Sequence, residues 1–335
     1  MPPPLLTGGR RRRRRKRRTA GAVLLALVLA AAGLLALGQR EAGPARESVT
    51  ASADADIQIG ASGPAPLAGG GTAPTPLAVT LADGRSPVQI PFKRVPRSGL
   101  LFDLDTGRVL WRRMPSRVLP IASLTKMMTA LVVVDRVPPG AKVRVTKEAL
   151  AYKGSAVGVL PRGKWIGVNT MLHGLLLPSG NDAAIALAQR AARTVPRFVR
   201  LMNRKAKALG LTCTRFSSPD GFKNAGNHSC ATDLAAIARA LLREPRLARI
   251  VRRRQAVLPF PIKGGKLYLS NHNPLLRMGY PGTTGVKTGY TDAAGRCLVA
   301  TARRGRVRLG VVLLHSYDPG TQARKLLDRG FRTAT

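Results

Sequence analysis

The sequence predicts an α+β protein. An antiparallel sheet is expected from the first and last segments of the globular part, flanked by helices, with an all-helical lobe inserted between them. Apolar runs typical of strands occur at residues 98–113 and again after residue 284. Between them, apolar residues recur three and four positions apart, as in amphipathic helices. A cleft is expected where the sheet meets the lobe.

The N-terminal region indicates export. Residues 1–19 include nine consecutive basic residues, and residues 20–38 are apolar and uncharged. Such a stretch is long enough to cross a bilayer as a helix, and the preceding positive charge predicts a cytoplasmic N-terminus. We favour an uncleaved single-pass anchor in the cell membrane with the body outside. Cleavage near Gly38, as in a signal peptide, is the alternative and would give a secreted protein.

A tether and one domain are expected after the anchor. Residues 39–87 are rich in Ala, Gly, Pro, Ser and Thr and lack a periodic apolar face. This composition is typical of a disordered linker. Residues 88–335 are long enough for a single domain with a large core, and we expect the function to reside there.

The elements of this domain are predicted in order along the chain. The first is a strand hairpin that turns at Asp105–Gly107, and the next is a helix from about Ser123 to Val134. Further helices are expected at residues 169–177, 181–195, 195–210, 231–242 and 319–331, and strands at residues 284–291, 295–304 and 307–316.

The composition is strongly basic, because 56 Lys and Arg against 16 Asp and Glu give a net charge of +40. Such a charge attracts polyanions. Nucleic acid is not an expected partner, since the body is exported and the few aromatic residues form no stacking platform. Anionic lipid head groups or anionic wall polymers are candidate partners; a solvated surface without a ligand is the alternative.

Three short motifs occur once each, in a fixed order and in distinct predicted elements. Ser-x-x-Lys lies at the start of a helix, Ser-x-Asn in a loop between helices, and Lys-Thr-Gly on a strand. They comprise Ser123 and Lys126, then Ser179 and Asn181, then Lys287, Thr288 and Gly289. Each motif alone is weak evidence of function, but the three together indicate a serine nucleophile with a lysine base.

The first two motifs supply groups for acyl transfer. Residues three apart share a helix face, so the amine of Lys126 can reach Ser123 Oγ. Lys126 must be neutral to accept the proton, and burial together with the charge of Lys287 would lower its pKa. Ser179 is predicted to relay a proton to the leaving amine. Asn181 is predicted to hold the substrate backbone.

The third motif supplies the opposite wall. Lys287 and Thr288 are expected to bind a terminal carboxylate through charge and a hydroxyl group. Gly289 has no side chain, so a substrate backbone can lie along the strand. The backbone N–H groups of Ser123 and Tyr290 are expected to stabilise the oxyanion.

These motifs and their surroundings resemble the low-molecular-weight penicillin-binding proteins, specifically the serine-type D-alanyl-D-alanine carboxypeptidases of peptidase family S11. The resemblance covers about residues 99–335 and includes "PIASLTKMMTA", "LLLPSGNDAA", "SNHNPLL" and "GVKTGYTDAAGRCLVA". It implies a β-lactamase/transpeptidase-like fold. It also implies removal of the terminal D-alanine from peptidoglycan pentapeptide stems through an acyl-serine, without metal or cofactor, and acylation of the same serine by β-lactams such as penicillin. Many members carry a further β-rich domain, which is not expected here, so anchoring would fall to the N-terminal segment.

The cysteines and histidines suggest structural roles. In an exported protein Cys213 and Cys230 are candidates for a disulfide; two reduced, partly buried thiols are the alternative. Cys297 lies on an apolar strand and is expected in the core. The four histidines lack zinc-like spacing, so no metal site is expected.

Other functions remain open at this point. DD-endopeptidase cleavage of crosslinks would use the same residues. A β-lactamase needs a glutamate that positions water, and only Glu148 and Glu244 follow residue 101, neither in a fitting context. A slow β-lactam or muropeptide receptor would use Ser123 as a trap, but the cytoplasmic part has no signalling domain.

Overall fold

The computed structural model describes residues 77–81, 86–222 and 226–334, all within the compact unit that spans residues 67–335. Within these residues no helix is both long enough and apolar enough to cross a bilayer. The predicted tail, anchor and most of the predicted tether, residues 1–76, lie outside the described residues.

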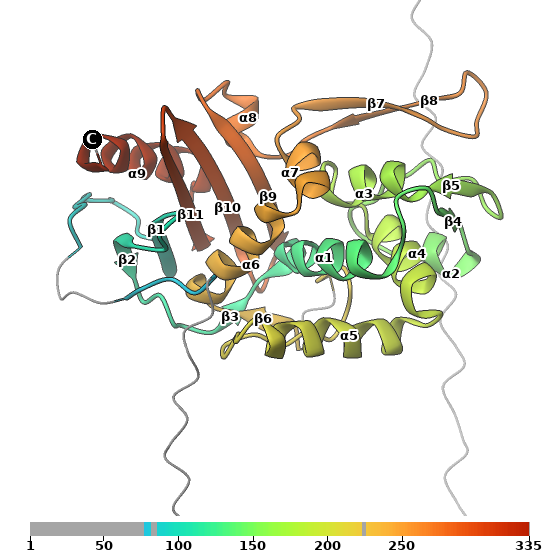
Figure 1. The fold of residues 1–335 in the computed structure, drawn as a ribbon, viewed down its shortest axis with the longest axis horizontal. Coiled ribbons are helices and arrows are strands. Elements are labelled where there is room, and N and C mark those ends of the chain that lie inside the picture. Colours follow the sequence, from blue (N-terminus) through green and yellow to red (C-terminus); the bar gives the residue numbers. More distant parts are fainter. Residues whose placement is uncertain (1–76, 82–85, 223–225, 335) are drawn as a thin grey trace, which may run out of the picture. The chain divides into compact units, whose positions relative to one another are not determined.

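A five-stranded antiparallel sheet is built from both ends of this unit, as predicted (Figure 1). Its central pairing joins Leu101 to Val311, although these residues are far apart in the sequence. The strand order is β2-β1-β11-β10-β9, with β1 at Ser98–Asp103, β2 at Val109–Arg113, β9 at Thr283–Thr291, β10 at Gly295–Arg304 and β11 at Val307–Ser316.

Each face of the sheet buries its own core because side chains alternate along a strand. On β11, Val311 and Leu313 face the core beneath helix α9 (Pro319–Ala334), where they join Leu326. Val312 and Leu314 face the larger core, which the inserted helices complete. These helices are α1 (Lys126–Arg136), α3 (Val168–Leu176), α4 (Asn181–Ala192), α5 (Val195–Ala208) and α6 (Ala231–Arg243).

Several short elements were not predicted, because segments of two to seven residues give too few repeats for a pattern to be recognised. They are the strands β3 (Leu119–Pro120), β4 (Lys142–Arg144), β5 (Trp165–Gly167), β6 (His228–Ser229), β7 (Gln255–Pro259) and β8 (Lys266–Ser270), and the helices α2 (Lys147–Leu150), α7 (Pro245–Val251) and α8 (Pro274–Arg277). The β7–β8 hairpin projects from the body (Figure 1).

The packed part of the chain begins earlier than residue 88, where the domain was predicted to start. Arg239 donates from Nη1 to the carbonyl of Ala78 (2.7 Å) and from Nε to that of Leu104 (2.9 Å). Arg112 donates to the carbonyl of Leu81 at 2.6 Å. The side chains of these two arginines hold the segment through hydrogen bonds to its backbone carbonyls, which a boundary predicted from composition cannot take into account.

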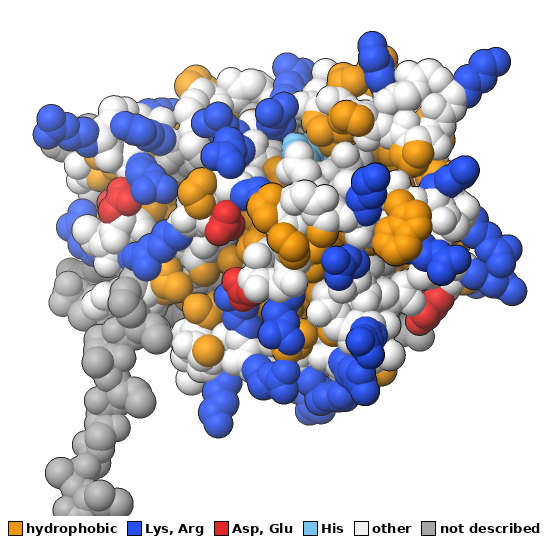
Figure 2. All heavy atoms as spheres, turned by 45° about the vertical axis from the view of Figure 1, so that its right-hand side comes forward, with side chains coloured by type: hydrophobic (Ala, Val, Ile, Leu, Met, Phe, Trp, Pro, Cys, Tyr) orange, Lys and Arg blue, Asp and Glu red, His pale blue; other side chains and the backbone are white. Residues whose placement is uncertain are grey.

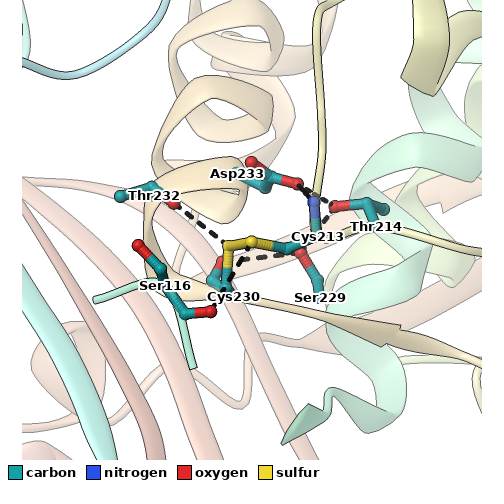
Figure 3. Close-up of a disulfide and its surroundings, with 7 residues drawn as sticks. All are labelled: Ser116, Cys213, Thr214, Ser229, Cys230, Thr232 and Asp233. Atoms are coloured by element: carbon teal, nitrogen blue, oxygen red, sulfur yellow. Dashed lines mark hydrogen bonds between the residues drawn. A yellow bond between two sulfur atoms is a disulfide. The ribbon is translucent and has the colours of Figure 1, made fainter. Parts of the chain in front are cut away.

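Cys213 and Cys230 form a disulfide at the start of α6 (Figure 3). Asp233 Oδ2 accepts hydrogen bonds from the backbone N–H of Cys213 (2.8 Å) and from Thr214 Oγ1 (2.7 Å). The disulfide and this carboxylate therefore fix the same loop from two sides. Cys297 is buried on β10, as predicted.

Candidate active site

A cleft of about 490 Å³ opens between the sheet and the helical lobe. Five of the predicted site residues line it: Ser123, Ser179, Thr288, Gly289 and Tyr290. Its other walls come from Ser155, His272, Pro274, Arg277, Met278, Arg296, Cys297 and residues 318–321. The three motifs therefore meet at one place, although Ser123 and Lys287 are far apart in the sequence.

Ser123 lies on a 3₁₀ turn, Ala122–Thr125, and not within the α-helix predicted from this residue. The α-helix begins at Lys126. Side chains three positions apart eclipse one another in a 3₁₀ turn. Accordingly, Lys126 Nζ lies 2.8 Å from Ser123 Oγ.

The Lys126 amine is fully buried and makes three hydrogen bonds. Besides Ser123, its Nζ donates to Asn181 Oδ1 (2.7 Å) and to the carbonyl of Asp220 (2.7 Å). Burial lowers the pKa of Lys126 to about 8, while the carboxylates of Asp220 and Asp182 act in the opposite direction. A substantial fraction of this amine is therefore neutral near physiological pH.

The second motif lies at the junction of α3 and α4. Ser179 adopts a left-handed conformation (φ +67°), which lets the chain turn sharply before α4 begins at Asn181. The Asn181 amide bridges two groups, since Oδ1 accepts from Lys126 and Nδ2 donates to the carbonyl of Lys153 at 2.8 Å. Asp182, not identified from the sequence, accepts from the N–H of Val157 at 2.9 Å. It thereby fastens the loop beside the cleft.

Strand β9 forms the opposite wall. Lys287 Nζ donates to Ser179 Oγ (3.0 Å) and to the carbonyl of Thr288 (2.8 Å). Burial, together with the charge of Lys126, holds the pKa of Lys287 well below its usual range. A Cβ at Gly289 would lie 2.9 Å from the carbonyl oxygen of Ile121 and 3.1 Å from the backbone N of Ser123, so a side chain there would push the strand away from the serine. Tyr290 is exposed at the mouth of the cleft.

Sequence reasoning missed the loop that carries Asp220. Its carbonyl accepts from Lys126, and a Cβ on the next residue, Gly221 (φ +73°), would collide with the carbonyl of Ala122. The stretch Pro219-Asp220-Gly221 is recognisable as a turn. Its local sequence gives no sign that the turn would close over a lysine 94 residues earlier.

The sequence profile of the D-alanyl-D-alanine carboxypeptidase family, peptidase S11, matches residues 89–317. D-alanyl-D-alanine carboxypeptidase DacF of Bacillus subtilis (strain 168) is 36% identical over 243 residues, covering 70% of this chain and 62% of the relative. A D-alanyl-D-alanine endopeptidase of Pseudomonas aeruginosa is 34% identical, with 77% of this chain and 87% of the relative covered. The chain thus spans about three-fifths of the length of DacF and most of the endopeptidase.

The fold gives the same assignment. The crystal structure of a D-alanyl-D-alanine carboxypeptidase from Mycobacterium tuberculosis H37Rv superimposes with a TM-score of 0.69 at 34% identity. The superposition covers 75% of this chain and 96% of that structure, so the expected β-lactamase/transpeptidase-like fold is confirmed. The profile match, the sequence identities and this superposition all place the chain in the D-alanyl-D-alanine carboxypeptidase family, peptidase S11.

Proposed function

We propose that this protein is a serine D-alanyl-D-alanine carboxypeptidase that removes the terminal D-alanine from peptidoglycan pentapeptide stems and is acylated by β-lactams. One observation carries the proposal. A buried lysine amine with a lowered pKa lies 2.8 Å from a serine hydroxyl that lines an open cleft. This arrangement supplies a nucleophile and a base without a metal or an organic cofactor.

In the acylation step, neutral Lys126 accepts the proton of Ser123 Oγ while the oxygen attacks the carbonyl carbon of the penultimate D-alanine. The backbone N–H groups of Ser123 and Tyr290 stabilise the oxyanion. When the tetrahedral intermediate collapses, the C–N bond breaks and Ser179 relays a proton to the departing amine. Lys126, which has passed its proton through Ser179 to the amine, then accepts a proton from a water molecule that attacks the acyl-serine. The acyl C–O bond breaks, and Lys126 returns this proton to Ser123 Oγ.

The strand side holds the substrate. Lys287 and Thr288 bind the terminal carboxylate, and the stem backbone lies along β9 where Gly289 leaves room. Because Lys287 is fully buried, a carboxylate that enters the cleft stabilises its charged form and raises its pKa. The side chain of Asn181, fixed between Lys126 and the carbonyl of Lys153, orients the peptide.

DD-endopeptidase activity on crosslinks is a second candidate function, because one matched relative is named a D-alanyl-D-alanine endopeptidase. A β-lactamase is disfavoured. Within the described residues, Glu244 caps α7, Glu148 Oε2 accepts from Gln189, and neither lines the cleft. A slow receptor for β-lactams or muropeptides would keep the same cleft and differ only in turnover.

We also propose that residues 20–38 anchor the protein in the cell membrane, with the catalytic domain outside and the segment up to about residue 76 as a tether. The uncharged apolar stretch after a basic run supports this. Fractionation of cells with intact-mass analysis of the mature protein tests it. Recovery of a chain that starts after Gly38 would show cleavage instead.

The test of the function uses the full chain with benzylpenicillin and a D-Ala-D-Ala peptide in parallel, and the Ser123→Ala variant as the control. Intact mass reports the penicillin adduct, and an assay for free D-alanine reports turnover. A long-lived adduct with D-alanine release, both absent in the variant, is the expected result. An adduct without release points to a receptor or an endopeptidase, and rapid loss of the adduct to a β-lactamase.

A further inference from the structure

We propose that helix α5 carries a binding site for a linear polymer with repeated phosphate groups, on a surface separate from the cleft. The site is a row of cations, called here the arginine stripe, at spacings of four, three, four and three residues. The stripe consists of Arg193, Arg197, Arg200, Arg204 and Lys207.

The spacing places Arg197, Arg200, Arg204 and Lys207 on one face of α5, and Arg193 follows the end of α4, two residues before α5 begins. Residues three and four apart in a helix lie above one another, so the cations form a line and not a ring. At a rise of about 1.5 Å per residue, the part from Arg197 to Lys207 spans roughly 15 Å. All five side chains are exposed. Figure 2 shows Lys and Arg side chains gathered along the lower edge of the molecule, where α5 lies in Figure 1.

A hollow adjoins the stripe. Arg136 from the end of α1 and Ala191 and Ala192 from the end of α4 enclose, with Leu201 and the four stripe arginines, a hollow of about 370 Å³. It shares no lining residue with the active-site cleft. Guanidinium groups bind phosphate oxygens in a bidentate manner. Five arginines line this hollow, so its chemistry is suited to phosphate.

The protein itself does not neutralise these charges. The ion pairs found among the described residues join Lys205 to Asp135, Arg304 to Asp328 and Arg308 to Asp105, and none includes a stripe residue. Arg197 lies in the first turn of α5, where the helix dipole disfavours a cation. Neighbouring stripe residues also repel one another. The stripe therefore opposes folding of α5, and a bound polyanion would relieve this repulsion.

The composition of this surface favours a hydrated polymer over a membrane. A helix that binds at a membrane interface presents large apolar side chains beside its cations. Among the described residues, the large hydrophobic side chains that are exposed lie outside α5. The aromatic residue of α5, Phe198, is fully buried, so no ring is available to stack on bases. Recognition would rest on the phosphate groups alone.

The experiment measures binding of a labelled poly(glycerol phosphate) oligomer by fluorescence anisotropy at several salt concentrations. It uses the full chain in neutral bicelles. Residues 10–18, which would bind the same probe, are replaced by serine in every protein compared. The stripe variant carries Gln at Arg193, Arg197, Arg200 and Arg204. The matched control carries Gln at Arg252, Arg254, Arg306 and Arg324, four exposed arginines from other elements.

We expect the stripe variant to bind the oligomer at least tenfold more weakly and the control to bind within about threefold of the parent. If each lost phosphate contact contributes about 0.7 to the salt slope, the slope should fall by about 3 in the stripe variant only. The Tm of the stripe variant should equal or exceed that of the parent, because repulsion is removed. D-alanine release from a soluble peptide should not change, so failure of the proposed peptidase activity remains distinguishable from failure of this inference.

Three results would overturn the proposal. Equal losses in both variants would mean that net charge alone attracts the oligomer. Unchanged affinity in the stripe variant would place the binding elsewhere. In a further arm, phosphatidylglycerol is added to the bicelles at the same phosphate concentration as the oligomer. If this lipid displaces the oligomer and the displacement requires the stripe, a membrane surface is the partner.

Discussion

Acylation of Ser123 by penicillin should depend on pH in the way that the burial of Lys126 dictates. With a pKa of about 8, about one tenth of the amine is neutral at pH 7, half at pH 8 and nine tenths at pH 9. An unperturbed lysine would be neutral in only about 0.03% of molecules at pH 7, so burial increases the neutral fraction of the amine roughly 300-fold. The second-order acylation rate should rise about tenfold per pH unit below pH 7 and reach a plateau above pH 9.

Stopped-flow acylation with a fluorescent penicillin across this range measures the midpoint. The Asp182→Asn variant provides the control, because Asp182 raises the pKa of Lys126 and is not among the groups that shift the pKa of Lys287. Its midpoint should therefore move to lower pH. A wild-type midpoint near that of free lysine, or a rate independent of pH, would refute neutral Lys126 as the base. An unshifted midpoint in the variant would assign the titration to another group.

Further predictions concern groups described above. Ser123→Ala should abolish covalent labelling by penicillin and leave Tm unchanged. Intact mass and calorimetry measure these two properties, and persistent labelling would mean that another residue is the nucleophile. Gly289→Ala should lower the acylation rate by tenfold or more, because the added methyl group would lie 2.9 Å from the carbonyl of Ile121; an unchanged rate would mean that the strand can move away. Replacing both Cys213 and Cys230 by Ser should lower the unfolding free energy by about 3 kcal/mol, given the 17-residue separation. Chemical denaturation measures this loss, and an unchanged midpoint would show that the loop is held without the disulfide.

The fold was predictable where elements were long. The nine- and ten-residue strands at the end of the domain and the helices between residues 168 and 243 carry several periods of an apolar pattern, and the structure has them close to the predicted bounds. Strands of two to five residues, such as β4 and β7, carry too few periods of this pattern to be recognised. The start of the packed region was placed too late because Arg239, a helix residue, holds a segment whose composition resembles a linker.

The motif residues of the site were predictable, whereas the groups that set their chemistry were not. Ser123, Lys126 and Lys287 belong to motifs whose residue types predict a reaction. The Asp220 carbonyl that holds Lys126 is a backbone group, and any residue at that position would provide one. The role of Asp182 depends on a loop at residues 157–158 that folds back onto it. Contacts of this kind arise from tertiary structure and leave no local signature.

The pairing of β1 with β11 constrains the order in which the protein can fold during synthesis. Leu101 finds its partner, Val311, only 210 residues later in the chain. Lys287, on the opposite wall of the cleft, is likewise synthesised long after Ser123. A growing chain can form its helical lobe early but cannot close the sheet until its final strands emerge, and contacts of such sequence separation form slowly. Ser123 therefore lacks its opposite wall until β9 has been synthesised and has paired with β10.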